Sequence, residues 1–324
     1  MKETEGEKRK MGKVGFVLLC VVVFIVAFVG SMIFKVTHKP AWAKKYSVEW
    51  SEEIGKKELD LSYGDKPANK FDLYLPKAKR DNYGLVVYLH AGGFTSGDKA
   101  GDAEILEWLC SLGYVAAGIN YTLRTEENEA SVYSQSEEIK EAIPVVIAEA
   151  KKLGYNIDEM AIAGGSAGHT LAMLYAYRDA KTAPVPVKLV FGLVGPSSFF
   201  AEDWKNYGLD QSTEAAAELF GVMLGQEITS AQIESGEYEK MMKPISAYAW
   251  VNKDSAPSVL AYGKYDKVQP FDGVRHLEEA LKENGVDYKL FVGEHSGHGM
   301  QNDNKVYSEF MATVEEYLQK YMPV

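Results

Sequence analysis

The sequence has little cysteine, with only Cys20 and Cys110 among 324 residues. Two cysteines exclude a disulfide framework and a cysteine-rich metal site. Basic residues are also in deficit, because 35 Lys and Arg face 46 Asp and Glu, for a formal net charge of −11. A nucleic-acid-binding protein needs a positive surface, so we expect no DNA or RNA partner. The remaining composition, 46% apolar and 25% charged, is that of a globular chain and excludes collagen-like, mucin-like and wholly disordered proteins.

Long uncharged hydrophobic runs are absent with one exception, residues 14–34. At about 1.5 Å per residue, a helix of this run crosses a hydrocarbon layer about 30 Å thick. Basic residues precede the run, which favours an export signal over a buried core helix. Its length exceeds the roughly 7 to 15 apolar residues of a cleavable signal, which favours a retained anchor. We expect the N-terminus inside and the bulk of the chain outside; cleavage would instead give a secreted protein.

These features predict four parts. Residues 1–13 form a short basic tail, 14–34 a transmembrane signal-anchor, 35–55 a linker, and 56–324 a single α/β domain. Membrane contact is therefore expected through the N-terminal helix. No internal repeat or low-complexity tract interrupts the domain.

Short apolar runs and helical stretches alternate along this domain. Several of the runs are nearly continuous, as expected for strands that are buried on both faces. The alternation predicts a mostly parallel sheet flanked by helices. We expect strands at Phe71–Leu75, Leu85–Leu89, Tyr114–Ile119, Met160–Ala163, Leu189–Val194, Ser258–Tyr262 and Tyr288–Val292, and helices at Asp102–Leu112, Ser136–Leu153, Ala167–Tyr177, Phe271–Asn284 and Lys305–Tyr321.

One segment breaks this alternation. From about residue 195 to 250 no strand is apparent, and a helix is expected at Thr213–Leu224. A long insertion of this kind is consistent with a helical lid over a site and equally with a helical decoration of the surface.

The strongest local motif is Gly164-Gly165-Ser166-Ala167-Gly168, between an expected strand and an expected helix. A strand, a tight turn and a helix are the context of a nucleophile elbow, in which small neighbours allow a strained serine and close backbones. A glycine-rich phosphate turn is the alternative, but the spacing G-x-G-x-x-G and the pair G-K-[ST] are both missing. We therefore interpret Ser166 as a nucleophile.

A serine nucleophile needs fixed hydrogen-bond donors for the oxyanion that develops on the substrate. The expected strand Leu85–Leu89 leads into His90-Ala91-Gly92-Gly93, a turn with exposed backbone amides. Together with the amide of Ala167, those of Gly92 and Gly93 are predicted to form the oxyanion hole.

The serine also needs a base and an acid, which follow the elbow in this architecture in the order serine, acid, histidine. His298 lies in the loop after the last expected strand, where a catalytic histidine should emerge. His295 is in the same loop and is the weaker candidate. For the acid, Asp266 lies just past the strand Ser258–Tyr262, where it can orient the imidazole. The remaining histidines after the elbow have other expected roles: His276 at the surface of a helix, and His169 in packing.

These residues together resemble the α/β-hydrolase serine esterases, in particular the hormone-sensitive-lipase-like and acetylxylan/feruloyl-esterase-like branch. The resemblance covers roughly residues 71–321. Its motifs are Leu73-Tyr74-Leu75-Pro76, His90 to Gly93 followed by Ser96-Gly97-Asp98, Asn120-Tyr121-Thr122-Leu123, the Ser166 elbow, Ala256-Pro257 and Gly297-His298-Gly299.

The resemblance implies a triad of Ser166, Asp266 and His298 and oxyanion donors at Gly92, Gly93 and Ala167. Two departures matter. Ala91 replaces a commoner glycine, which should restrict the turn, and His169 stands where a glycine is usual, so that the helix start could be shifted.

We therefore expect a serine carboxylesterase that needs no metal or cofactor and acts on small-molecule or polysaccharide esters, with acetyl or feruloyl esters of polysaccharide among the candidates. Two other functions stay open. One is a serine peptidase of the prolyl-oligopeptidase type, although no stretch of the chain has the length of its propeller domain. The other is a membrane-tethered binding module without turnover.

Overall fold

The computed structural model of the protein describes residues 42–324. Residues Tyr46–Val324 form one compact unit, and the unit Met1–Lys45 contributes only residues 42–45 to the description. The predicted anchor at 14–34 lies outside the described residues. Within the described part of the chain, no helix is both long and apolar enough to span a bilayer.

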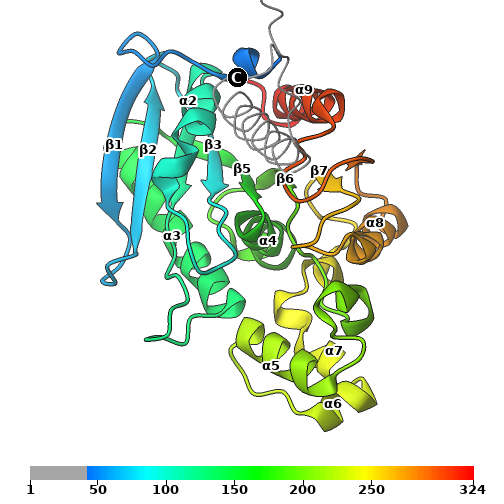
Figure 1. Ribbon diagram of the computed structural model, residues 1–324. Helices are drawn as coiled ribbons and strands as arrows, with labels where there is room; N and C mark the ends of the chain where they lie inside the picture. Colours follow the sequence, from blue (N-terminus) through cyan, green and yellow to red (C-terminus); the bar gives the residue numbers. More distant parts are fainter. Residues whose placement is uncertain (1–41) are drawn as a thin grey trace, which may run out of the picture. The chain divides into compact units, whose positions relative to one another are not determined.

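An eight-stranded, mostly parallel sheet forms the centre of the compact unit (Figure 1). The strand order is β1-β2-β4-β3-β5-β6-β7-β8. The pairs β1–β2 and β2–β4 are antiparallel, and every other neighbouring pair is parallel. The carboxyl ends of the last six strands in this order therefore meet at one edge. The strands are β1 Gly55–Ser62, β2 Lys70–Pro76, β3 Tyr83–Leu89, β4 Val115–Ile119, β5 Ile157–Gly165, β6 Val187–Leu193, β7 Ser258–Gly263 and β8 Tyr288–Gly293.

Helices cover both faces of this sheet, with α2 and α9 on one face and α3, α4 and α8 on the other (Figure 1). The α-helices are α2 Ala103–Ser111, α3 Val132–Lys152, α4 Ala167–Leu174, α5 Thr213–Leu224, α6 Ser230–Ser235, α7 Tyr238–Met241, α8 Val274–Glu283 and α9 Asn304–Tyr321. One π-helical turn, η3 Tyr175–Asp179, follows α4. Short 3-10 helices occur at η1 Ala43–Tyr46, η2 Lys99–Asp102, η4 Ala180–Thr182, η5 Ala201–Tyr207, η6 Lys243–Ile245, η7 Ala247–Trp250 and η8 Phe271–Gly273.

The predicted strands and helices are all present, with boundaries that differ by up to four residues, and one strand was not predicted. Strand β1 was not predicted, because it is an edge strand of mostly exposed and half-buried residues in which charged side chains interrupt the leucines and leave no apolar run. Helix α3 begins at Val132, four residues earlier than expected. Ser131 and Ser134 form a capping box there, which satisfies amides of the first turn and allows the helix to start among polar residues.

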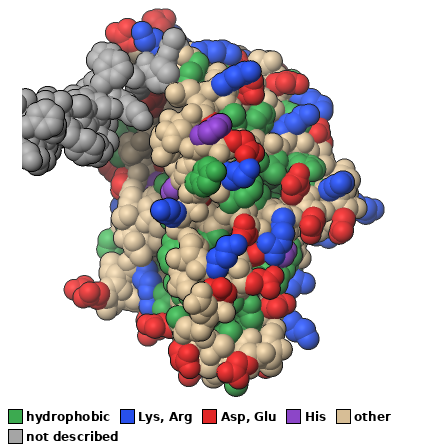
Figure 2. Space-filling model, turned by 45° about the vertical axis from the view of Figure 1, so that its right-hand side comes forward, with side chains coloured by type: hydrophobic (Ala, Val, Ile, Leu, Met, Phe, Trp, Pro, Cys, Tyr) green, Lys and Arg blue, Asp and Glu red, His purple; other side chains and the backbone are tan. Residues whose placement is uncertain are grey.

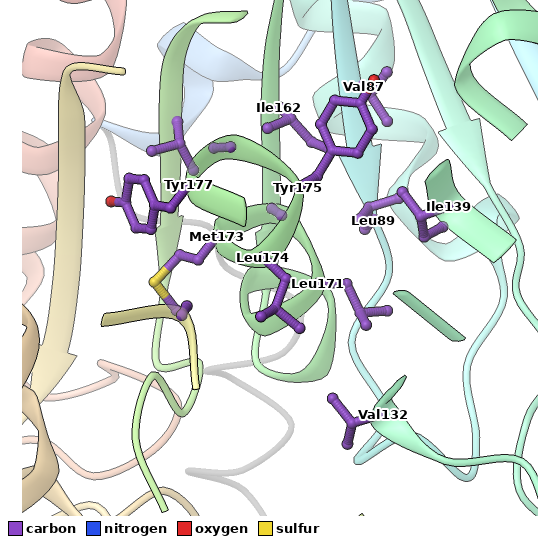
Figure 3. Close-up of a cluster of buried hydrophobic side chains, with 14 of the residues drawn as sticks. Val87, Leu89, Val132, Ile139, Ile162, Leu171, Met173, Leu174, Tyr175 and Tyr177 are labelled. Atoms are coloured by element: carbon purple, nitrogen blue, oxygen red, sulfur yellow. The ribbon is translucent and has the colours of Figure 1, made fainter. Parts of the chain in front are cut away.

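The core between the sheet and helices α3 and α4 supports the region around the predicted elbow. Leu171 and Leu174 of α4 lie beside Leu89 of β3 and Ile139 of α3 (Figure 3). All four side chains are fully buried. Apolar burial of this extent stabilises α4 against the strands.

The insertion is helical and contains no strand, as predicted. Helices α5, α6 and α7 lie together beyond the edge at which the parallel strands end (Figure 1). Its first turn, η5, is attached to α8, because the buried carboxylate of Asp203 pairs with Arg275 at 2.6 Å and with His276 at 2.9 Å. His276 is therefore not the surface residue that was expected, since its side chain is only 19% exposed.

Replacing Leu171 tests the contribution of this core. We expect Leu171→Ala to lower the free energy of unfolding by about 2–5 kcal/mol, because it removes a fully buried side chain and leaves a cavity. Urea denaturation measures the change. Leu59→Ala is the matched control: Leu59 is 53% exposed on β1, and its loss should change the free energy by about 0.5 kcal/mol or less. Equal effects of the two substitutions would contradict this account of the core.

Candidate active site

Ser166 lies at a sharp turn between β5 and α4, with backbone dihedrals of φ 50° and ψ −120°. A residue with a side chain rarely adopts these dihedrals, which cost about 1–3 kcal/mol. The amide of Ser166 donates to the carbonyl of Leu193 at 2.9 Å, and its carbonyl accepts from Thr170 at 3.1 Å. These bonds tie the turn to β6 and to the first turn of α4.

The glycines of the motif allow three backbones to approach closely. A Cβ atom on Gly168 would lie 2.0 Å from the carbonyl oxygen of Leu89, and one on Gly164 would lie 2.5 Å from the carbonyl carbon of Gly168. Neither position can accept a side chain without moving the backbone. Helix α4 begins directly at Ala167, so its start is not shifted by His169.

The structure brings Ser166, His298 and Asp266 together in one hydrogen-bonded line. The Oγ atom of Ser166 lies 2.9 Å from Nε2 of His298, and Nδ1 of His298 lies 2.7 Å from Oδ2 of Asp266. Because a carboxylate only accepts, Nδ1 donates, which leaves Nε2 free to accept the serine proton. The Asp266 side chain is 2% exposed and that of His298 28% exposed, so the line runs from the interior to solvent.

Asp266 is held by the backbone of its own loop. Its second oxygen, Oδ1, accepts from the amides of Val268 at 2.8 Å and Gln269 at 2.9 Å. One oxygen therefore fixes the carboxylate and the other orients the imidazole. The insertion contacts the same loop: Asn206 donates to the carbonyl of Lys267 at 2.7 Å and Tyr207 to that of Val268 at 2.9 Å. Burial, and secondarily the charge of Asp266, raises the pKa of Tyr207.

The loop that carries His298 is fixed by Asp303, at the start of α9. Its Oδ2 accepts from the hydroxyl of Ser296 at 2.6 Å and from the amide of His295 at 3.0 Å. The bond from Ser296 and the contact with His295 lower the pKa of Asp303. The carbonyl of Ser296 in turn accepts from the amide of Tyr265 at 2.9 Å, which links the histidine loop to the acid loop.

The turn after β3 has the backbone expected of an anion site. Gly92 and Gly93 have positive φ angles of 135° and 60°, and within residues 42–324 their amides donate to no acceptor. The buried ring of His90 donates from Nδ1 to the carbonyl of Ala91 at 2.9 Å and stacks on Tyr121. Burial lowers the pKa of His90, which favours the neutral ring.

The other histidines have structural contacts. His169 is fully buried, and its Nδ1 accepts from the amide of Gly195 at 3.2 Å, in agreement with the packing role expected for it. Burial lowers its pKa to about 3. The His295 side chain is 80% exposed and pairs with Asp303, away from Ser166. In the described part of the chain, no group of three or more His, Cys, Asp or Glu side chains is placed to hold a metal ion.

The BD-FAE family model matches residues 71–281, which include the turn at His90, the Ser166 elbow and Asp266 but end before His298. The chain belongs to the BD-FAE family of α/β-hydrolase esterases. The family resemblance inferred from the motifs is confirmed.

Solved structures similar to this BD-FAE member are also esterases. A truncated carbohydrate esterase from gut microbiota has a TM-score of 0.63 and 17% identity, covering 82% of this chain and 98% of that one. Esterase 2 of Thermogutta terrifontis has a TM-score of 0.65 and 22% identity, covering 84% of this chain and 94% of that one. It has also been solved with propionate and with butyrate bound. At these identities the likeness shows the α/β-hydrolase fold.

A curated relative is the kynurenine formamidase of Danio rerio, 26% identical over 139 residues. The match covers 42% of this chain and 44% of the relative. The chain is therefore matched to less than half the length of that relative.

The buried His169 predicts a pH-dependent stability. Its pKa is about 3 in the folded protein and about 6.5 in the unfolded chain, so between these pH values only the unfolded chain binds the proton. The free energy of unfolding is therefore highest above pH 6.5 and decreases as the pH falls towards 3. Between pH 7 and pH 5, this histidine should lower the free energy of unfolding of the wild type by about 2 kcal/mol. We expect His169→Asn, whose side-chain oxygen can accept from Gly195, to lack this contribution, so that its free energy of unfolding falls by about 2 kcal/mol less over the same range. Urea denaturation at both pH values measures this, and parallel pH curves for the two proteins would contradict it.

Proposed function

We propose that the protein is a serine carboxylesterase that hydrolyses short-chain acyl esters through an acyl-enzyme on Ser166. The observation that carries this proposal is the continuous line of hydrogen bonds from Ser166 through His298 to Asp266. A serine hydroxyl is a weak nucleophile until a positioned base removes its proton, and this line supplies the base and orients it.

In the proposed reaction, Nε2 of His298 takes the proton of Ser166 as Oγ attacks the ester carbonyl. Asp266 keeps the imidazole in the required tautomer and stabilises the imidazolium. His298 then protonates the leaving alcohol, and the acyl group remains on Ser166. A water molecule, deprotonated by the same imidazole, attacks the acyl-enzyme and releases the acid.

The negative charge on the substrate oxygen requires donors that are already in place. We assign this role to the amides of Gly92, Gly93 and Ala167. The first two donate to no acceptor within residues 42–324, and the third belongs to the first turn of α4, where helix amides have no partner within the helix. The positive end of the helix dipole favours an anion at the same place.

For the substrate, we propose short acyl esters, with acetyl or feruloyl esters of polysaccharide as candidates. Propionate and butyrate bound to the Thermogutta esterase support a short acyl group, and the carbohydrate esterase supports a saccharide alcohol. The face shown in Figure 2 has acidic, basic and hydrophobic side chains intermixed.

We further propose that residues 14–34 anchor the catalytic domain, residues 56–324, at the outer side of a membrane, with the N-terminus inside. The sequence of this segment supports the proposal. An extracellular domain would meet polymeric esters that do not enter cells.

Removing a member of the triad tests the proposed mechanism. We expect Ser166→Ala and His298→Gln each to lower kcat by about 10⁶-fold, and Asp266→Asn to lower it by about 10⁴-fold, because the three groups act as a unit. Hydrolysis of a nitrophenyl acetate measures kcat. A fluorophosphonate probe should label the wild type at Ser166 and leave Ser166→Ala unlabelled.

The matched control is Ser235→Ala, which replaces an exposed serine at the end of α6 whose hydroxyl donates to the carbonyl of Gln232 and accepts from the amide of Glu237. It should retain wild-type activity and labelling. Full activity of Ser166→Ala would refute the mechanism. Absence of labelling and turnover in the wild type would favour a binding module without catalysis.

A substrate panel tests the substrate class. We expect nitrophenyl acetate, propionate and butyrate to be hydrolysed with a kcat/KM at least about 10-fold above that of the octanoate, because each methylene that the acyl pocket does not accept costs binding energy. Release of acetate from acetylated xylan tests the saccharide alcohol. A preference for a dipeptide anilide over all the esters would instead indicate a peptidase.

A further inference from the structure

In the turn from His90 to Phe94, the backbone carbonyls and amides differ in their hydrogen bonding. Four of its carbonyls accept a hydrogen bond, whereas the amides of Gly92 and Gly93 donate none within residues 42–324. The carbonyl of His90 accepts from the Tyr121 hydroxyl at 2.9 Å, and that of Gly92 from the Ser96 amide at 3.0 Å. The other two accepting carbonyls are those of Ala91 and Phe94.

These carbonyl bonds determine where the free amides point. A trans peptide is planar, and its C=O and N–H groups point in opposite directions. The carbonyl of Ala91 is turned towards the His90 ring, so the N–H of Gly92 points the other way. The carbonyl of Gly92 is likewise turned towards Ser96, and the N–H of Gly93 points away from it. Fixing the carbonyls therefore aims the two amides to which the proposed function assigns the oxyanion.

Phe94, which follows these glycines, is itself strained. Its φ of 67° is in the left-handed region, which costs a residue with a side chain about 1 kcal/mol or more. Its carbonyl accepts from the amide of Arg124 at 3.0 Å and from Nε2 of Gln135 at 2.9 Å. The N–H of the same peptide, that of Thr95, donates to the carbonyl of Gly92 at 3.1 Å. A group that donates to the Phe94 carbonyl therefore holds the peptide between Phe94 and Thr95. Through the Thr95 N–H, that peptide in turn holds the peptide between Gly92 and Gly93, which carries the Gly93 amide.

Gln135 is the one side chain among the donors to Phe94, and it comes from α3. It is fully buried, and Nε2 also donates to the carbonyl of Thr122 at 2.8 Å. Its amide group thus connects the turn after β3 to the loop after β4. We propose that Gln135 is a positioning residue, which holds the Phe94 peptide and thereby orients the amides of Gly92 and Gly93. This inference rests on the proposed function, since it concerns how the oxyanion donors are kept in place.

The variant Gln135→Met removes both donors and retains the length of the side chain. A displaced oxyanion donor should cost less than an absent one, which costs about 10²–10³-fold in kcat. We therefore expect kcat for a nitrophenyl acetate to fall about 10-fold, with KM changed about 2-fold or less. Urea denaturation accompanies the kinetics, so that folding and catalysis are compared on the same protein.

A thionoester provides a readout that a merely structural role would not move. Its sulfur is a weaker hydrogen-bond acceptor than oxygen, so the oxyanion donors stabilise its transition state less. We expect Gln135→Met to slow the thionoester about 2-fold or less, and the ratio of the oxoester rate to the thionoester rate to fall about 5-fold or more. A loss of folded protein would slow both esters equally and leave the ratio unchanged.

The matched control is Ser136→Ala. Ser136 is the next residue of α3 and is also buried, but its hydroxyl donates to the carbonyl of Tyr133 in the same helix. Its loss should leave the ratio at the wild-type value. If Gln135→Met does not fold, Gln135→Asn carries the test, because it retains the amide on a side chain one methylene too short to reach both carbonyls, and it should lower the ratio.

An unchanged ratio in the folded Gln135 variants would overturn this inference and leave the proposed function intact. A ratio that fell equally in Ser136→Ala would also overturn it, because the effect would then belong to α3 in general. Absence of turnover of both esters by the wild type would overturn the proposed function, and this inference with it.

Discussion

The active site depends on one hydrogen bond, the 2.9 Å contact between Nε2 of His298 and Oγ of Ser166. It joins residues 132 positions apart, which lie on loops after different strands. The bond exists because β5, β7 and β8 run parallel, so that the loops after them open at the same edge of the sheet. A shift of about 1 Å in any of these loops would separate the proposed base from the proposed nucleophile, and such misplacements cost about 10²-fold in rate.

The loops are held by carboxylates that accept hydrogen bonds from groups within them. Asp266 uses one oxygen for two backbone amides of its own loop, and Asp303 binds the histidine loop through Ser296 and the amide of His295. Charged acceptors make stronger hydrogen bonds than neutral ones, so each carboxylate stiffens a segment that has no regular secondary structure. The insertion adds contacts to the acid loop through η5, which makes it part of the support of the site.

Close backbone packing at the Ser166 turn is a second constraint on the site. It requires glycine, because a side chain at the closest positions would not fit. Gly164 and Gly168 let β3, β5 and α4 meet within distances that no Cβ atom could occupy. The strained dihedrals of Ser166 persist because the buried core around Leu171 holds α4 in place. The turn after β3 is instead held by hydrogen bonds to its carbonyls, and within residues 42–324 the amides of Gly92 and Gly93 donate to no acceptor. If these amides are the oxyanion donors, as proposed, they need no reorganisation when charge develops.

The sequence by itself determined the features that depend on neighbours along the chain. Continuous apolar runs predicted the buried strands, and the glycines around Ser166 predicted the elbow, because local sterics decide both. The edge strand β1 escaped prediction, since half-exposed charged residues leave no such pattern. The motif placement already favoured His298 over His295, and the structure places His298 against Ser166. Only the tertiary structure decided that His276 pairs with Asp203 and that Gln135 binds Phe94. Hydrogen bonds between distant residues need only one donor and one acceptor at the right place, and a single polar side chain leaves no periodic signal in a sequence.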